Sequence, residues 1–311
     1  MRDDPSLDER HRSCRQQWYQ EFAAASETLG VRVGREPLPR GLCIERRDQD
    51  DPPLVFLYVP GRWETGEPWA ALPQHDRRFL LAMQGFPVAT VRLSAAGARS
   101  PTSTEELVAE IHAAQAAIAQ RWAGAHVVLM GYSMGASLAF LACAEMEAAG
   151  LVILDGGLPD ARWVDQAEPL TAASSQNPWL HPRGLRSALN IDAASTDVVR
   201  QSHLRWRMTQ SRHWPHGQAN EIRQLRLPSG LDPVILLSRI ECPVLCVAAG
   251  DRDPPEDHRS IRTARLTSAR SIQIHRTPLD HEGVASGVGL AADNVTQQVL
   301  SFVRSIGKAM T

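Results

Sequence analysis

The chain has 311 residues, enough to bury a full hydrophobic core, and its 33 basic and 35 acidic residues give a net charge of −2. This near-balance excludes the basic footprint of a nucleic-acid-binding protein. No segment approaches the roughly 18 consecutive apolar residues of a membrane span, and the charged N-terminus lacks a signal-peptide core. We therefore expect a cytoplasmic protein with no membrane or nucleic-acid partner.

The five cysteines are odd in number and scattered along the chain, which favours reduced thiols. Cys143 and Cys246 lie in apolar segments and are predicted to be small buried core residues. Cys242 and Cys246 alternate on one predicted strand, and two such residues cannot close a tetrahedral metal site by themselves. We predict neither a metal nor a cofactor.

Apolar runs and helical periodicity alternate along most of the chain. The first part predicts, in order, an amphipathic helix within 7–29, strands at 31–33, 42–46 and 54–59, a helix near 73–84, a strand at 87–91, a helix from a capping box at Ser103 and Glu106 to about 123, a strand at 126–130, a helix at 136–146 and a strand at 151–154. The last part predicts a helix at 231–240, strands at 243–247 and 271–275, and a helix at 294–307.

The strands are apolar throughout rather than alternating, which is typical of strands covered on both faces. Such strands alternating with helices predict an α/β fold with a doubly wound, mostly parallel sheet. Residues 158–228 break this rhythm, and a stretch of that length is too long for a connecting loop. We expect three parts: an N-terminal helical extension (1–29), a core (30–157 and 229–311) and an inserted helical cap (158–228) after the strand that ends near Asp155.

The most informative motif is Gly131-Tyr132-Ser133-Met134-Gly135, which follows the strand at 126–130 and precedes a helix. A serine in a G-x-S-x-G turn between a strand and a helix is held with its hydroxyl exposed at the start of the helix. The helix N-terminus then favours a developing negative charge beside the serine. We predict that Ser133 is a nucleophile; the alternative is a serine that only caps the helix.

A serine hydroxyl needs a base, and the base needs a group that orients it. The strand at 243–247 is followed by Gly250-Asp251-Arg252-Asp253, and the last predicted strand is followed by Asp280-His281-Glu282. With these motifs the chain resembles the α/β-hydrolase fold superfamily, in the branch with a serine nucleophile and an inserted helical cap. The resemblance covers roughly 30–157 and 230–308, and it matches no particular subfamily.

The resemblance implies the order nucleophile, acid and base, with Ser133, Asp253 and His281 in these roles. Asp253 is favoured over the alternative acid Asp251 because it is the third residue after Gly250. Asp155, at the end of the preceding strand, is a further alternative for the acid. His258 is the weaker alternative for the base.

The resemblance also implies an oxyanion hole with two backbone N–H donors. Met134, directly after the nucleophile, supplies one donor, and Arg62 in the turn Pro60-Gly61-Arg62-Trp63 supplies the other. Many family members carry a His-Gly pair in that turn, so the proline at position 60 departs from the common pattern.

The substrate is expected to be a small molecule with an apolar or aromatic acyl group, because half of the tryptophans lie in the predicted cap. The residues assigned to substrate binding are Trp63, Tyr132, Trp163, Trp179, Trp206 and Trp214. An equal alternative is that the cap tryptophans only pack the cap onto the core.

These observations predict a serine hydrolase that cleaves a carboxylic ester or thioester through an acyl-enzyme. The first alternative keeps the fold but runs an acyltransferase, lyase or cyclase reaction. A second alternative is a non-catalytic ligand-binding protein. It is disfavoured because a serine, an aspartate and a histidine are all present in the expected order. The sequence leaves the oligomeric state open, with a homo-oligomer as one alternative.

Overall fold

A computed structural model gives the structure of residues 20, 23–24, 26–34, 37–38, 41–61, 76–93, 103–158, 232–250, 258–279, 281–285 and 290–310. The described strands are β1 (Val31–Gly34), β2 (Leu42–Arg46), β3 (Leu54–Val59), β4 (Val88–Thr90), β5 (His126–Tyr132), β6 (Gly150–Leu154), β7 (Val244–Ala249) and β8 (Ile272–Thr277). The helices are α2 (Arg77–Met83), α3 (Thr104–Arg121), α4 (Met134–Cys143), α9 (Pro233–Leu237), α10 (Arg259–Ala264), α11 (His281–Ala285) and α12 (Leu290–Met310).

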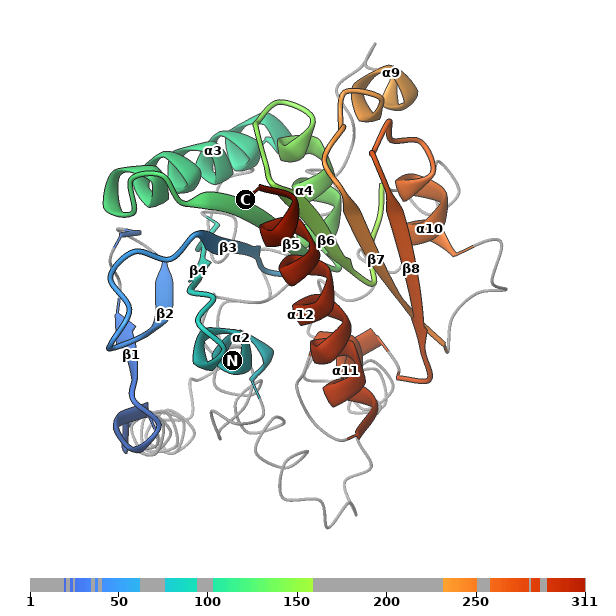
Figure 1. Cartoon of the computed structure of the whole chain (residues 1–311). Helices are drawn as coiled ribbons and strands as arrows, with labels where there is room; N and C mark the ends of the chain where they lie inside the picture. Colours follow the sequence, from blue (N-terminus) through green and yellow to red (C-terminus); the bar gives the residue numbers. More distant parts are fainter. Residues whose placement is uncertain are drawn as a thin grey trace, which may run out of the picture.

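The eight strands form one sheet in the order β1-β2-β4-β3-β5-β6-β7-β8 (Figure 1). β2 pairs antiparallel with both β1 and β4, and all pairs from β4 to β8 are parallel. The predicted doubly wound, mostly parallel sheet is therefore confirmed. Nearly all of the predicted cap (158–228) and most of the predicted N-terminal helix (7–29) lie outside the described residues, so the three-part division stays a prediction.

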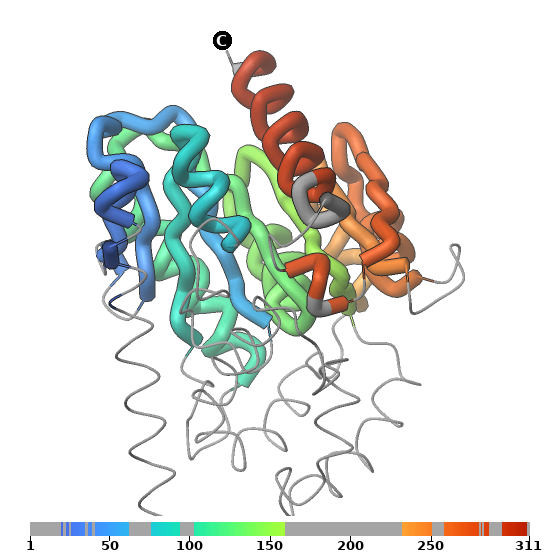
Figure 2. Tube along the Cα trace, turned by 90° about the horizontal axis from the view of Figure 1, so that it is seen from below, coloured from blue at the N-terminus to red at the C-terminus, as the bar shows by residue number. Residues whose placement is uncertain are grey.

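Helices cover both faces of the sheet (Figures 1 and 2). The side chains of the central strands β3, β5, β6 and β7 alternate between two hydrophobic cores. On one face Leu57, Leu129 and Ile153 pack against α3, α4, α9 and α10. On the other face Phe56 and Met130 pack against α2, α11 and α12. Burial on both faces is the physical reason why these strands read as continuous apolar runs.

Short sequence patterns predicted the start of several helices and strands correctly. α3 begins at the predicted capping box: the Glu106 N–H donates to Ser103 Oγ at 3.1 Å, and the Ser103 N–H donates to Glu106 Oε2 at 2.7 Å. The helices α10 and α11 were not predicted. Each has only five or six residues, too few for a recognisable helical period.

The order of the strands puts the crossover point at β3 and β5, which are adjacent although β4 and α3 lie between them in the sequence. After β3 the chain adds β4 on one side of this point. It then crosses over to β5 and adds β6, β7 and β8 on the other side. In open α/β sheets, ligands bind at the carboxyl ends of the strands that flank such a point. Residues after β3 and β5 are therefore expected to border the functional site.

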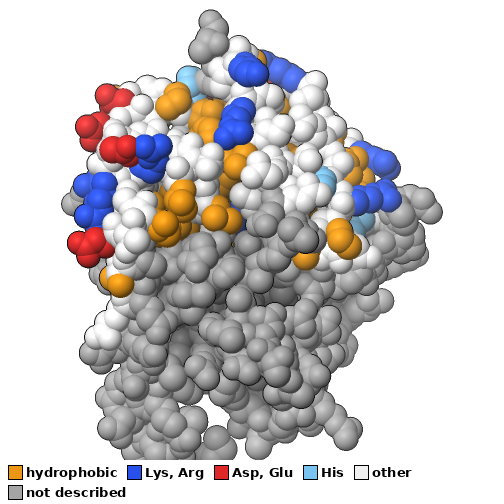
Figure 3. Space-filling model, turned by 60° about the horizontal axis from the view of Figure 1, so that its bottom comes forward, with side chains coloured by type: hydrophobic (Ala, Val, Ile, Leu, Met, Phe, Trp, Pro, Cys, Tyr) orange, Lys and Arg blue, Asp and Glu red, His pale blue; other side chains and the backbone are white. Residues whose placement is uncertain are grey.

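The described surface carries both charges, in keeping with the near-zero net charge. In Figure 3 acidic side chains lie near one edge beside basic ones, and further basic side chains lie at the opposite edge, with hydrophobic side chains between them. None of the helices in the described part of the chain is both long and apolar enough to cross a membrane.

Candidate active site

Ser133 lies in the sharp turn between β5 and α4, at φ 53° and ψ −118°. A positive φ is strained for a residue with a side chain, and such strain persists only where the surroundings impose it. The Ser133 N–H donates to the Leu154 carbonyl oxygen at 3.1 Å, which ties the turn to the end of the neighbouring strand. The predicted strand–turn–helix context of the motif is thus present in the structure.

Neither glycine of the motif could carry a side chain without a steric clash. A Cβ at Gly131 would lie 2.4 Å from the Gly135 carbonyl oxygen, and a Cβ at Gly135 would lie 2.1 Å from the Val59 carbonyl oxygen. These contacts are with the backbone, which cannot rotate away as a side chain can. The start of α4 therefore packs directly against the end of β3, and this close approach fixes the position of Ser133.

His281 lies beside Ser133 although the two are 148 positions apart in the sequence. Its Nε2 is 2.9 Å from Ser133 Oγ, a hydrogen-bonding distance. The imidazole also packs on the ring of Tyr132, with ring centroids 4.9 Å apart and an interplanar angle of 32°. The structure therefore brings together the two residues that the sequence analysis assigned to the nucleophile and the base.

A buried arginine, Arg77, forms a hydrogen bond with the short helix α11, which begins at His281. The Arg77 guanidinium, from the start of α2, donates to the Val284 carbonyl oxygen in α11. Its Nε donates to Thr296 Oγ1 in α12 at 3.3 Å. Because Arg77 is only 1% exposed, this link between three helices is shielded from water and supports the position of His281.

The carboxylate in contact with His281 is Asp155: its Oδ2 accepts a hydrogen bond from His281 Nδ1. The sequence predicts Asp253 in this position, with Asp251 as the alternative and Asp155 as a further candidate. Asp251 and Asp253 lie outside the described residues. Because Asp155 occupies the Nδ1 side of the imidazole, we assign to it the acid's position in place of Asp253.

The register of the sheet explains why Asp155 can reach the histidine. Tyr132 on β5 pairs with Leu154 on β6, so Ser133 and Asp155 are the next residues of two adjacent parallel strands. Both have a positive φ, 53° and 48°, and they are the two non-glycine residues with this conformation in the described part of the chain. Strained backbone often gathers at functional sites, and here it occurs at two contacting strand ends.

The glycines after Asp155 let this strand end pack closely against the nucleophile. A Cβ at Gly156 would lie 2.2 Å from the Ser133 carbonyl oxygen, and a Cβ at Gly157 would lie 2.6 Å from Thr263 Oγ1. The sequence signal for this acid was therefore Asp155-Gly156-Gly157 directly after the strand that follows the nucleophile. The later G-x-x-D turn was favoured instead because it matches the more familiar family pattern.

The second carboxylate oxygen of Asp155, Oδ1, also has hydrogen-bond partners. Oδ1 accepts a hydrogen bond from the Ala249 N–H at 2.9 Å and lies 2.9 Å from His258 Nε2. His258 is 6% exposed, and its Nδ1 has no hydrogen-bond partner among the described residues. His258, the weaker candidate for the base, thus contacts the acid while His281 contacts Ser133.

The donors around Asp155 keep it ionised. Burial by itself raises the pKa of this carboxyl, but hydrogen bonds from His258, His281 and the Ala249 N–H outweigh burial and hold the pKa well below its usual range. A carboxylate that remains charged can fix the Nδ1–H tautomer of His281, which leaves Nε2 free to accept a proton from Ser133.

This depressed pKa predicts a contribution of Asp155 to stability at acidic pH. The unfolded carboxyl takes up a proton near pH 4, whereas the folded one stays ionised, so the contribution is present above about pH 4 and is lost as the pH falls below it. We expect the melting temperature of wild type to fall more steeply between pH 5 and 3 than that of Asp155→Asn. Thermal denaturation at several pH values measures both slopes, and equal slopes would contradict the assigned shift.

The predicted oxyanion hole lies only partly within the described residues. Met134 is the first residue of α4, where backbone N–H groups have no partner inside the helix. The turn after β3 reaches the nucleophile, because a Cβ at Gly61 would lie 3.2 Å from Ser133 Cβ. Arg62, the predicted second donor, lies outside the described residues, as do Trp63, Trp163, Trp179, Trp206 and Trp214. Tyr132 lies within them, and its ring packs against His281.

Comparison with known proteins places this arrangement in a family. A family model described as the alpha/beta hydrolase family matches residues 54–285, while none of the curated proteins matches. A putative lipase (lip1) from Acinetobacter baumannii AYE has a TM-score of 0.65 at 15% identity, with 95% of this chain and 97% of that chain covered. A thermophilic esterase from Thermogutta terrifontis has a TM-score of 0.61 at 15% identity, with 89% and 98% covered.

The Vlm2 thioesterase domain has a TM-score of 0.51 at 16% identity, with 80% of this chain and 93% of that chain covered. At such identities these three likenesses concern the fold alone. The family model, in contrast, spans most of the chain and includes β3, the Ser133 turn and α11. The chain therefore belongs to the alpha/beta hydrolase family.

Proposed function

We propose that this alpha/beta hydrolase is a serine esterase or thioesterase, which cleaves a carboxylic ester or thioester through an acyl-enzyme. The observation that carries the proposal is the continuous chain of contacts from Asp155 through His281 to Ser133 Oγ. A serine at the turn can form an ester with an acyl group, and a neutral imidazole at 2.9 Å can take its proton.

In the acylation step, Ser133 Oγ attacks the carbonyl carbon of the substrate while its proton passes to His281 Nε2. The negative charge that develops on the carbonyl oxygen is stabilised by the Met134 N–H, with the Arg62 N–H as the proposed second donor. His281 then gives its proton to the leaving alcohol or thiol, and the acyl group remains on Ser133 as an ester.

In the deacylation step, water attacks the acyl carbon while His281 takes one of its protons. The tetrahedral intermediate collapses, Ser133 Oγ regains a proton from His281, and the carboxylic acid leaves. Throughout both steps Asp155 remains ionised and stabilises the positive charge that His281 acquires.

We assign His258 a positioning role, because it holds Asp155 Oδ1 on the side away from His281. Replacing it by leucine leaves the Ala249 N–H as a donor to that oxygen and should lower kcat by roughly ten- to a hundredfold with little change in KM. Glutamine keeps an N–H donor at a comparable reach, so His258→Gln should recover most of kcat. Steady-state kinetics of the two variants test this, and equal activities would contradict the role.

The proposed function is tested by labelling the protein with a fluorophosphonate probe and locating the adduct by mass spectrometry. We expect one adduct, on Ser133, and no adduct in Ser133→Ala. Turnover is then measured on p-nitrophenyl esters with acyl groups of increasing length and on acyl-CoA thioesters. An apolar acyl pocket predicts that kcat/KM rises with acyl length.

The outcomes separate the alternatives. Labelling at Ser133 with turnover of esters or thioesters supports the proposed hydrolase. Labelling without release of acid from any of these substrates favours an acyltransferase, lyase or cyclase reaction. A folded protein that is not labelled at Ser133 removes the nucleophile and with it the proposal.

A further inference from the structure

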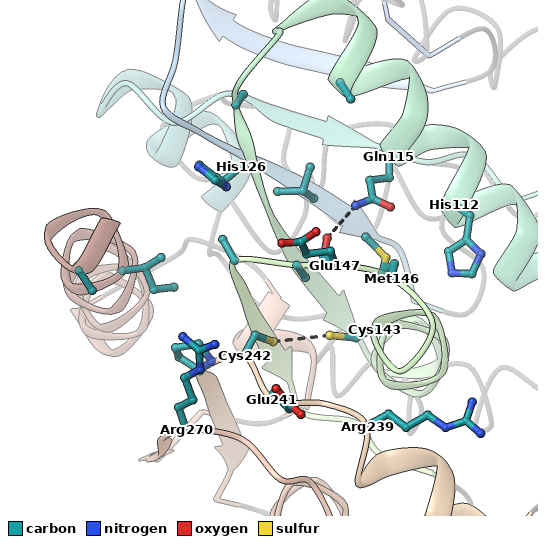
Figure 4. A pocket seen from close by; sticks show the side chains of 18 of the residues that line it. His112, Gln115, His126, Cys143, Met146, Glu147, Arg239, Glu241, Cys242 and Arg270 are labelled. Carbon is teal, nitrogen blue, oxygen red and sulfur yellow. Dashed lines mark hydrogen bonds between the residues drawn. The ribbon is translucent and has the colours of Figure 1, made fainter. Parts of the chain in front are cut away.

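A second site lies at the opposite end of the sheet from Ser133. A cavity of about 770 Å³ is bordered by the amino ends of β5, β6, β7 and β8 and by the C-terminal end of α4. The residues of this cavity that matter here are Cys143, Cys242, Arg239, Glu241 and Arg270 (Figure 4). The proposed reaction at the carboxyl ends of the strands uses none of them.

Two of the lining residues are thiols that face each other. Cys143 is the last residue of α4, and Cys242 lies two residues before the start of β7 at Val244. Their sulfur atoms are 3.6 Å apart, a hydrogen-bonding contact between residues 99 positions apart in the sequence. A disulfide needs about 2.05 Å between the sulfurs, so the side chains must approach by roughly 1.5 Å.

The two thiols differ in exposure and in charge environment. Both cysteines line the cavity, but Cys143 is buried, whereas Cys242 is partly exposed. The hydrogen bond between the two thiols and the nearby positive charge of Arg270 lower the pKa of Cys242, while the same hydrogen bond and burial raise the pKa of Cys143. A partly exposed thiol with a lowered pKa beside a second, buried thiol is the usual arrangement of a reactive and a resolving cysteine.

We propose that Cys242 and Cys143 form a thiol–disulfide exchange site, at which a low-molecular-weight disulfide modifies Cys242 and Cys143 resolves the adduct. The Cys242 thiolate attacks one sulfur of the small disulfide, whose S–S bond breaks, and one small thiolate leaves and takes up a proton. The Cys143 thiol then loses its proton and attacks Cys242 Sγ, which releases the second small thiol. In total two protein thiols are oxidised and one small disulfide is reduced to two thiols.

The other described cysteines serve as internal controls. Burial raises the pKa of Cys43 to about 12, and burial together with the negative charge of Asp155 raises the pKa of Cys246 to about 12. Both thiols are therefore protonated and shielded, and neither should react. Cys14, which lies outside the described residues, is replaced by serine in every sample.

The experiment treats the full-length Cys14→Ser protein with glutathione disulfide and follows it by intact-mass and peptide mass spectrometry without reduction. We expect a transient adduct of one glutathione, followed by a cross-linked peptide pair that contains Cys143 and Cys242. In Cys143→Ala the glutathione adduct on Cys242 should persist, because no thiol resolves it. In Cys242→Ala both the adduct and the cross-link should be absent.

The oxidised protein should also be more stable, because the new bond closes a loop of about 100 residues in the unfolded chain. We expect a rise in melting temperature on the order of 5–10 °C, which a thiol reductant reverses. Two results would overturn the proposal: a Cys242 that reacts no faster than Cys43 and Cys246, or an adduct on Cys242 that never gives way to the cross-link. Because the readouts are mass and melting temperature, they do not depend on the proposed enzyme activity.

Discussion

Replacing Asp155 by asparagine is expected to lower kcat by roughly four orders of magnitude, whereas Asp253→Asn should stay within about twofold of wild type. Asparagine tolerates the positive φ at position 155, so the backbone there should be retained. The amide has no charge to stabilise a protonated His281, and its N–H₂ group favours the wrong tautomer of the imidazole. Steady-state kinetics on the best ester or thioester substrate provides the measurement.

The paired design distinguishes the two assignments of the acid. Both variants carry the same chemical change, and a melting curve for each shows whether the fold is retained. If Asp253→Asn caused the larger fall in kcat in a folded protein, the acid would be Asp253, as the sequence analysis favoured. Asp251→Asn completes the comparison and is also expected to leave kcat nearly unchanged.

Replacing Ser133 by alanine is expected to cause the largest loss, on the order of 10⁶-fold in kcat, because the acyl-enzyme can no longer form. A residual rate above that of the uncatalysed reaction should remain, since the oxyanion donors and the binding pocket are still present. KM should change little, because the hydroxyl is used in the chemical step. Progress curves at high enzyme concentration measure the residual rate.

Ser305→Ala provides a matched control. Ser305 lies on α12, where its hydroxyl donates to the Phe302 carbonyl oxygen at 2.6 Å, a local contact within one helix. This variant should keep full activity and full labelling by the fluorophosphonate probe. Activity within tenfold of wild type in Ser133→Ala, with contamination excluded, would refute the acyl-enzyme mechanism.

Much of the fold was predictable because its signals are local. The strands β2 and β3 have the predicted bounds, and α3 begins at the predicted cap Ser103. A continuous apolar run or a capping box depends on residues only a few positions apart, so it can be read from the chain. The motif around Ser133 belongs to the same class, since its strand, its turn and its helix are contiguous.

The acid was harder to predict because its position depends on strand register. Asp155 reaches His281 only because β6 lies next to β5 and because Leu154 pairs with Tyr132. Several aspartates follow predicted strands, and their order along the chain does not show which of them faces the histidine. Family resemblance favoured Asp253, and the pairing of two adjacent strands places Asp155 there instead.

His258 and the Cys143–Cys242 pair depend still more on tertiary structure. His258 contacts a carboxylate 103 positions earlier, and the two thiols meet across 99 positions, with no local pattern that marks either contact. The sequence by itself predicted the family, the parallel sheet and Ser133 and His281 as candidates for the nucleophile and the base, because short-range patterns encode them. Only the tertiary structure shows which carboxylate contacts the histidine and which thiols meet, because packing of distant segments sets those distances.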